Sequence, residues 1–106
     1  MPKYLIQASY TAEGVKGLLK DGGSKRRAAA ESAIKGLGGK LESFYFAFGN
    51  TDVFVVAEAP DNISAAAVSL AVSASGAVQA KTTVLLTPEE MDQVTKKTVK
   101  YRPPGA

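Results

Sequence analysis

The sequence contains neither histidine nor cysteine among its 106 residues. Without cysteine there is no disulfide framework of the kind that supports small secreted domains. Without either residue, most zinc sites, the Ser–His and Cys–His nucleophiles and the commonest general base are excluded. Haem ligation by histidine or cysteine is excluded too, although tyrosine remains available as a ligand. We therefore expect no metal or other cofactor, and any chemistry must use carboxylates, lysines and tyrosines.

The excess of positive over negative charge is also small, because 13 basic residues face 10 acidic ones and the net charge is only +3. The basic residues are scattered apart from Lys25-Arg26-Arg27 and Lys96-Lys97. A nucleic-acid-binding domain usually has a denser basic stripe with interleaved aromatic residues, so we expect no nucleic-acid partner. Cations at the start of a helix oppose its dipole, so the Lys25-Arg26-Arg27 run indicates an anion, an acidic neighbour or simply a solvated basic face.

Long apolar runs are absent as well. The first ten residues lack the layout of a signal peptide, and a cytoplasmic protein is the default expectation. The segment Asn62–Ala80 has no charged residue and approaches the length of a membrane span. It consists mostly of alanine and serine, however, and this composition favours a helix that is buried on one face of a soluble domain. We expect no membrane partner.

The chain divides into alternating strand and helix patterns. Lys3–Tyr10 alternates as a strand, and Thr11 is a candidate N-cap for a short helix that reaches Leu19. A firmer helix is predicted from an N-cap at Ser24 to the Gly38-Gly39 pair. Its predicted buried stripe is Ala30, Ala33, Ile34 and Leu37.

The second half repeats this order. Two strands, Leu41–Phe48 and Thr51–Ala59, flank a turn at Gly49-Asn50-Thr51-Asp52, and Pro60-Asp61-Asn62 begins a helix over Ile63–Ser75. The predicted buried stripe of that helix is Ala67, Leu70, Ala71 and Ala74. Val78–Leu86 is the last strand, and Thr87-Pro88-Glu89-Glu90 begins a short helix that reaches about Lys97.

This order predicts an α+β domain of the ferredoxin-like βαββαβ type. It has a four-stranded antiparallel sheet with both main helices on one face, because right-handed crossovers place them there. The first and third strands should be central. One domain is expected over residues 1–98, followed by a C-terminal tail over residues 99–106.

The length of the hairpin loop decides which side chains share a face. With an even number of loop residues, Phe44, Phe46 and Phe48 lie beside Val53, Val55 and Ala57, under the helices. An odd number would reverse the second strand alone and expose the three phenylalanines. We consider the even loop more favourable, and the odd loop remains an alternative.

The opposite face of the sheet would then be partly apolar and would have no helix to cover it. The simplest solution is a second copy that packs sheet against sheet as a dimeric α/β barrel. We predict a small apolar or anionic ligand there, held by side chains that share this face: Gln7, Ser9, Tyr45, Phe54, Glu58 and Lys81. Glu58 and Lys81 would act as an acid–base pair, or else as an ion pair or dimer contact at the barrel rim.

The turn between the two middle strands needs special residues. Gly49 and Asp52 are interpreted as structural, since an Asp in a turn commonly accepts hydrogen bonds from backbone amides. The alternative is that Asp52 is a base at the mouth of the barrel.

Several short motifs resemble the GYD-domain family of small bacterial proteins over most of the chain. They include Ser9-Tyr10-Thr11, Glu13-Gly14, Gly38-Gly39-Lys40-Leu41, Gly49-Asn50-Thr51-Asp52 and Ala59-Pro60-Asp61. The resemblance implies a dimeric ferredoxin-like domain without an established biochemical role. Thr51 occupies the position of the family's signature aromatic residue, so a role carried by that ring does not transfer to this chain.

Three functions follow as hypotheses. The leading one is an oligomeric small-ligand-binding or interaction module without established catalysis. The second is a cofactor-independent monooxygenase or isomerase of the dimeric α/β-barrel kind. It predicts an apolar cavity of a few hundred Å³, either between sheet and helices or inside the barrel, with polar groups converging on it. The third is a basic-surface interaction protein that uses Lys25, Arg26 and Arg27.

Overall fold

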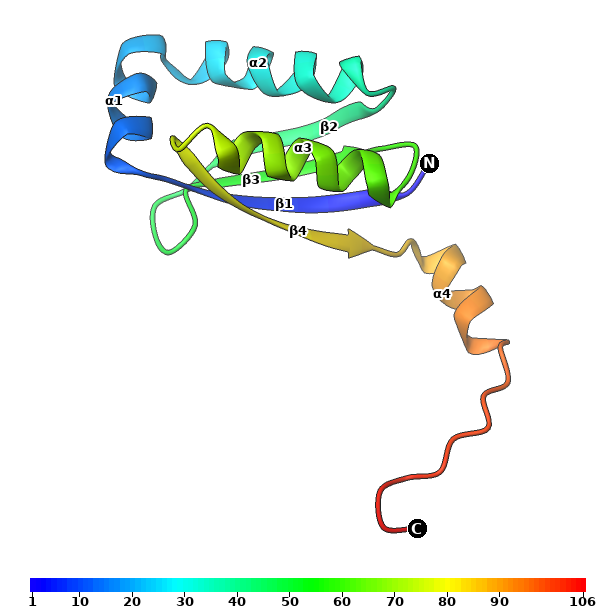
Figure 1. Ribbon diagram of the computed structural model, residues 1–106. Helices are drawn as coiled ribbons and strands as arrows, with labels where there is room; N and C mark the ends of the chain where they lie inside the picture. The colour runs from blue at the N-terminus through cyan, green and yellow to red at the C-terminus, as the bar shows by residue number, and fades with distance from the viewer.

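A computed structural model describes all of residues 1–106 as an α+β protein built on one four-stranded sheet (Figure 1). In chain order its elements are β1 (Lys3–Tyr10), α1 (Ala12–Asp21), α2 (Gly23–Gly36), β2 (Lys40–Phe46), β3 (Val53–Glu58), α3 (Asn62–Ala74), β4 (Val78–Leu85) and α4 (Pro88–Thr95). The strand order is β2-β3-β1-β4, and all neighbouring strands are antiparallel. The first and third strands are therefore central, as the sequence predicts.

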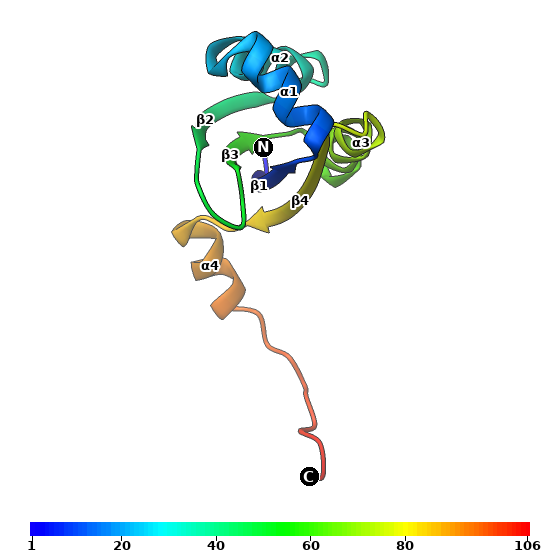
Figure 2. The same cartoon turned by 90° about the vertical axis from the view of Figure 1, so that its left-hand side faces the viewer.

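Helices α2 and α3 cover one face of this sheet. The two views agree that both helices lie on the same side, and α2 packs chiefly on β2 while α3 packs chiefly on β4 (Figures 1 and 2). No helix lies on the opposite face, which we call the open face. None of the helices combines the length and the apolarity that a membrane crossing needs.

The hairpin register agrees with the even loop. Phe46 pairs with Val53, so the loop is residues 47–52. Phe44 and Phe46 consequently share the helix-covered face with Val53 and Val55, and their rings meet edge to face at 5.3 Å. Phe48 is an exception, because β2 ends before it and its side chain is fully exposed in the loop.

A β-bulge near the start of β2 changes which side chain faces the core. The register shifts between Leu41 and Ser43, so Leu41 pairs with Ala57 while Ser43 pairs with Val56. A bulge inserts one extra residue and so reverses the alternation beyond it. Leu41 is buried for this reason, although strict alternation from Phe44 would turn it away from the helices.

The buried face of α3 differs from the predicted one. Ala65 is buried and Val68 and Val72 are half-buried, whereas Leu70 is 71% exposed. Ala67, Ala71 and Ala74, the other members of the predicted stripe, are exposed as well. The prediction was wrong because this helix is apolar nearly all round, so its periodicity does not single out one face.

Helix α2 begins earlier than predicted. Its N-cap is Gly22, with a φ of 80°, and Ser24 lies inside the first turn without capping it. Ile34 is the buried residue of its predicted stripe, Ala30 is half-buried, and Ala33 and Leu37 are exposed. The helix ends as predicted, because Gly38 takes a φ of 80° that other residues adopt only with strain.

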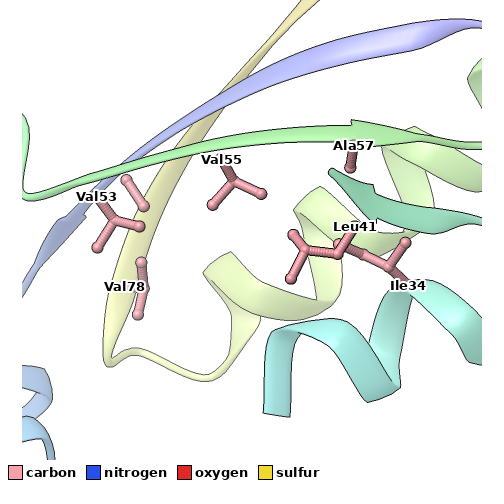
Figure 3. Packing of buried hydrophobic residues seen from close by; sticks show 7 residues of the cluster. Ile34, Leu41, Val53, Val55, Ala57 and Val78 are labelled. Carbon is pink, nitrogen blue, oxygen red and sulfur yellow. The ribbon is translucent and has the colours of Figure 1, made fainter. Parts of the chain in front are cut away.

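The core lies between the sheet and these two helices. Figure 3 shows Val53, Val55 and Ala57 projecting from β3 toward the helix layer, with Ile34 of α2 beside Leu41 of β2. Ala8 and Val78 complete the buried cluster. Most of these side chains are alanine or valine, which are short and leave space beneath the helices.

The chain beyond β4 forms an arm that leaves the body of the molecule. Helix α4 has the predicted capping box, in which Thr87 Oγ1 accepts from the Glu90 amide and the Glu90 carboxylate accepts from the Thr87 amide. Residues 88–106 are nearly all exposed, and the arm lies on the open-face side of the sheet in both views (Figures 1 and 2). The radius of gyration is 16.8 Å, against about 13 Å for a compact chain of this length.

Candidate functional site

The open face carries two cross-strand rows of side chains that include most of the predicted ligand-binding residues. In the first row, Tyr45, Phe54, Gln7 and Lys81 are paired across all four strands. In the second row, Ser43, Val56, Leu5 and Thr83 are paired in the same way. The predicted sharing of this face is therefore observed, because the antiparallel register places these residues opposite one another.

The first row includes two aromatic side chains that are exposed to solvent. Tyr45 is 69% exposed and Phe54 is 36% exposed, although both lie within strands. Gln7 offers an amide and Lys81 offers an ammonium group beside these rings. A row of this kind can hold a small planar or anionic molecule between aromatic and hydrogen-bonding groups.

Ser9 has a structural partner at the hairpin loop. Its hydroxyl donates a hydrogen bond to the carbonyl of Asn50 at 3.1 Å. It still lies on the open face, where it pairs with Gln79 on the edge strand. Its hydroxyl is nevertheless already engaged within the chain.

Asp52 has the structural role that the turn chemistry predicts. Its Oδ2 atom accepts a hydrogen bond from the Tyr10 amide at 2.9 Å, and its own amide donates to the Ala8 carbonyl at 2.9 Å. Its carbonyl also accepts from the Ala47 amide, which closes the loop. Gly49 has open space around its α-carbon and no positive φ, so its structural role receives no steric support.

Glu58 bonds to Lys3 rather than to Lys81. The Lys3 ammonium lies 3.5 Å from a Glu58 carboxylate oxygen and also bonds the Glu42 carboxylate. The hydrogen bond with Glu42, aided by the charges of both acids, raises the pKa of Lys3 above its ordinary value. Within one chain the predicted Glu58–Lys81 ion pair does not form, since Lys3 lies directly opposite Glu58 in the β1–β3 register. The predicted contact of these residues with a second copy stays a prediction.

A second candidate site lies on the other side of the sheet, between α2, α3 and the strands. It is a cavity of about 330 Å³ lined by 18 residues, 15 of them hydrophobic. Its floor includes Ile6, Val55 and Ala80, and its roof includes Ala33 of α2 and Ala71 of α3. The cavity exists because the helices present alanines to the space between them and pack over opposite edges of the same sheet face, α2 on β2 and α3 on β4.

Besides Tyr10, whose ring carries a hydroxyl, three polar residues contribute to the lining of this cavity. They are Arg26 of α2, Ser69 of α3 and Ser75 at the end of α3. The Ser75 hydroxyl donates to the Val72 carbonyl at 2.6 Å and accepts from the Ala77 amide, so it is satisfied locally. Arg26 forms a long ion pair of 4.0 Å with Asp21, which is itself outside the lining.

Sequence reasoning assigned several lining residues, such as Ala33, Val55 and Ala71, to the buried core, and it placed a cavity between sheet and helices only under the enzymatic alternative. The signal available was the alanine content of the two helices, together with the Lys25-Arg26-Arg27 run. That run does have the acidic neighbour that its position in the helix indicates, namely Asp21. No group of three acidic side chains is placed to hold a metal ion.

The family comparison covers nearly the whole of this fold. The family model of the GYD domain matches residues 4–95, from β1 to the end of α4. The protein belongs to the GYD-domain family. No curated protein and no solved structure shows significant similarity to the chain.

Steric contacts explain why two positions in the motifs shared with the GYD-domain family, Gly14 and Gly39, are occupied by glycine. A β-carbon on Gly14 would stand 1.9 Å from the Ala77 carbonyl oxygen, and one on Gly39 would stand 2.3 Å from the Glu58 carbonyl oxygen. Both distances are shorter than the non-bonded contacts that β-carbons make in proteins. In this GYD domain, glycine is therefore needed where α1 meets the start of β4 and where α2 leads into β2.

Proposed function

We propose that this GYD domain is a cytoplasmic, homodimeric small-ligand-binding module without catalytic machinery. The observation that carries the proposal is the open face, where Tyr45 and Phe54 are exposed within the strands and no helix covers them. The strand order β2-β3-β1-β4 supports a ferredoxin-like sheet, and a second sheet packed on this face would complete a dimeric α/β barrel.

The hydrophobic effect supports this arrangement. The open face holds Leu5, Tyr45, Phe54 and Val56 on adjacent strands, so their apolar surfaces are contiguous. Full burial of a fully exposed apolar side chain contributes about 1.5–3 kcal/mol before the cost of association. Leu5, Phe54 and Val56 are already partly buried in the single chain, so each would contribute a fraction of that value. A second copy presents the same surface, so a two-fold dimer would bury both faces at once.

The C-terminal arm supports the same partner. Its apolar side chains Met91, Val94, Val99 and Tyr101 are all exposed in the single chain. The arm lies on the open-face side, where a second copy would stand (Figures 1 and 2). In the proposed dimer each arm packs against the other subunit and covers these side chains.

The proposed ligand chamber lies between the two sheets. Its walls are the residues predicted from the sequence, namely Gln7, Ser9, Tyr45, Phe54, Glu58 and Lys81. Lys81 has no carboxylate partner within the chain, which supports an anionic group on the ligand or an acid of the second copy. Glu58 contributes from the end of the chamber nearest Lys3.

Oligomeric state tests the dimer directly. Phe54→Glu places a charge in the centre of the proposed interface and should convert the dimer to monomers, as measured by light scattering after size-exclusion chromatography. Ile63→Glu is the matched control, because Ile63 is 82% exposed on α3 and lies on the helix-covered side. A Phe54→Glu protein that remains a dimer of unchanged stability would refute this interface.

The enzymatic alternative rests on one observation, the cavity of about 330 Å³ beneath α2 and α3. Its volume meets the size expected of a substrate pocket. Its lining is mostly hydrophobic, however, and this favours binding over acid–base chemistry. Turnover of a candidate substrate that is lost in Glu58→Gln would overturn the non-catalytic proposal, and it would place the catalysis at the open face, because Glu58 does not line this cavity.

A further inference from the structure

The volume and the lining of the cavity under α2 and α3 limit the class of ligand that it can bind. Its floor is made by the central strands, where Ala8, Val53 and Val55 are buried in the core. Its roof is made by alanines on two helices that lie over opposite edges of the same sheet face. Because side chains of the core itself form the floor, the space is present before any ligand arrives.

The size of the cavity limits the ligand. A volume of about 330 Å³ equals roughly ten volumes of a liquid water molecule. Because the cavity is partly open to solvent, this volume limits the part of the ligand that lies inside it, which is a short alkyl chain or a single substituted ring. Its body must be apolar, since polar groups left without partners in such a lining would lose their hydration.

The charge in the lining determines the polar end of the ligand. Arg26 is the single charged residue among the 18 that line the cavity. Its neighbour Arg27 is exposed and does not contribute to the lining. A guanidinium matches a carboxylate with two parallel hydrogen bonds, which gives it a geometric preference for that group.

Asp21 is the acid that now accompanies Arg26. The closest nitrogen–oxygen distance is 4.0 Å, beyond hydrogen-bond length, and both side chains are more than one third exposed. Solvent screens such a pair, so it contributes little and leaves the donors of Arg26 available. A ligand carboxylate would compete with Asp21 or share the guanidinium with it.

We propose that this cavity binds a small amphipathic carboxylate, with its apolar body over the sheet and its carboxylate on Arg26. The site lies within one chain and on the opposite side of the sheet from the open face. It therefore does not depend on the proposed dimer or on the chamber between two sheets.

Octanoate and octanamide form a matched pair of probes, because they differ in the charged group and hardly at all in size. Titration of the isotopically labelled protein, followed by NMR, gives both the affinity and the location of binding. We expect octanoate to shift the signals of Val68, Val72 and Ala80 and to bind roughly fivefold more tightly than octanamide, as a partly exposed ion pair allows. Equal affinity of the two probes, or shifts confined to the open face, would overturn the proposal.

Charge variants separate a specific ion pair from the general positive charge of the protein. Arg26→Gln should reduce octanoate affinity to that of octanamide, while Arg27→Gln, with the same change in net charge, should leave it unchanged. Asp21→Asn should strengthen octanoate binding, because it removes the competing carboxylate. Equal losses in Arg26→Gln and Arg27→Gln would show a non-specific electrostatic effect and refute the role of Arg26.

Filling the cavity tests the location independently of charge. Ala71→Leu adds volume to the roof and should abolish the binding of both probes. Ala67→Leu adds the same volume to an exposed position of α3 that does not line the cavity, and should bind as the unmodified protein does. Circular dichroism confirms that each variant is folded, and unchanged binding in folded Ala71→Leu would refute the site.

Discussion

The Asp52 carboxylate accepts a hydrogen bond from the backbone amide of Tyr10 at 2.9 Å, which joins the hairpin loop to the end of β1. Tyr10 is the last residue of β1, and the next residue, Thr11, caps α1. One side chain therefore fixes the loop, the central strand and the entry to the first helix relative to one another.

Removal of this carboxylate should destabilise the fold. Asp52→Ala leaves the Tyr10 amide without its partner, and we expect the free energy of unfolding to fall by about 1–3 kcal/mol in urea denaturation. Asp52→Asn keeps an acceptor oxygen and should lose less. Asn50→Ala changes the same loop without removing a side-chain bond, and a loss as large as that of Asp52→Ala would contradict this account.

Replacing Gly14 or Gly17 of α1 by alanine should have opposite effects on stability. Gly14→Ala places a methyl group against the Ala77 carbonyl and should lower the free energy of unfolding by about 3 kcal/mol, because the backbone must move. A β-carbon on Gly17 would meet no atom within 4 Å, so Gly17→Ala should raise the free energy of unfolding by about 0.5–1 kcal/mol through helix propensity. Similar effects of the two substitutions in urea denaturation would show that α1 does not dock on the start of β4.

Thr82 has a buried hydroxyl without a hydrogen-bond partner. It lies on the helix-covered face opposite Ile6, where an unpaired polar atom is costly. Thr82→Val should therefore raise the free energy of unfolding by about 1 kcal/mol. The matched substitution Thr83→Val, on the open face, should change it little, and a loss of stability in Thr82→Val would reveal a partner for that hydroxyl.

Asp61 should make part of the stability dependent on pH. The hydrogen bond from the Ser64 amide, followed by that from the Ser64 side chain, lowers the pKa of Asp61 below its ordinary value of 3.8. A lowered folded pKa means that this stabilisation is complete above 3.8 and is lost as the pH falls through the folded pKa.

Asp61→Asn provides the reference for that measurement, because asparagine also caps helices but does not titrate here. The difference between the urea midpoints of the two proteins should shrink as the pH falls below 3.8. A difference that stays constant over that interval would show that the Asp61 charge does not contribute to the stability of α3.

Local patterns predicted the sheet better than they predicted the helices. The alternation of Phe44 and Phe46 with Val53 and Val55 sufficed to predict which side chains share a face, because a one-residue slip would have exposed the whole set. It did not predict the exact pairing, since the loop spans residues 47–52 and Phe48 lies outside β2. The position of Leu41 required the bulge, which alternation alone does not reveal. For α3, residues such as Leu70 and Val72 are almost equally apolar, and only the position of the sheet decides which of them is buried.

The candidate sites divide in the same way. Gln7, Tyr45, Phe54 and Lys81 could be grouped from the sequence, because the strand register alone brings them into one row. The partner of Glu58 depended on the neighbouring strand, where Lys3 rather than Lys81 lies opposite it. The cavity depends on the distance between two helices far apart in the chain, and no short-range pattern carries that information.

The bulge in β2 has a further consequence for how this sheet meets other chains. β2 is an edge strand, and an edge presents unpaired amides and carbonyls that can recruit a foreign strand. The bulge interrupts this row beside the charged side chains of Lys40 and Glu42, and such features oppose strand addition and the aggregation that follows it. The same bulge that turns Leu41 into the core thus also hinders the addition of a foreign strand at this edge of the sheet.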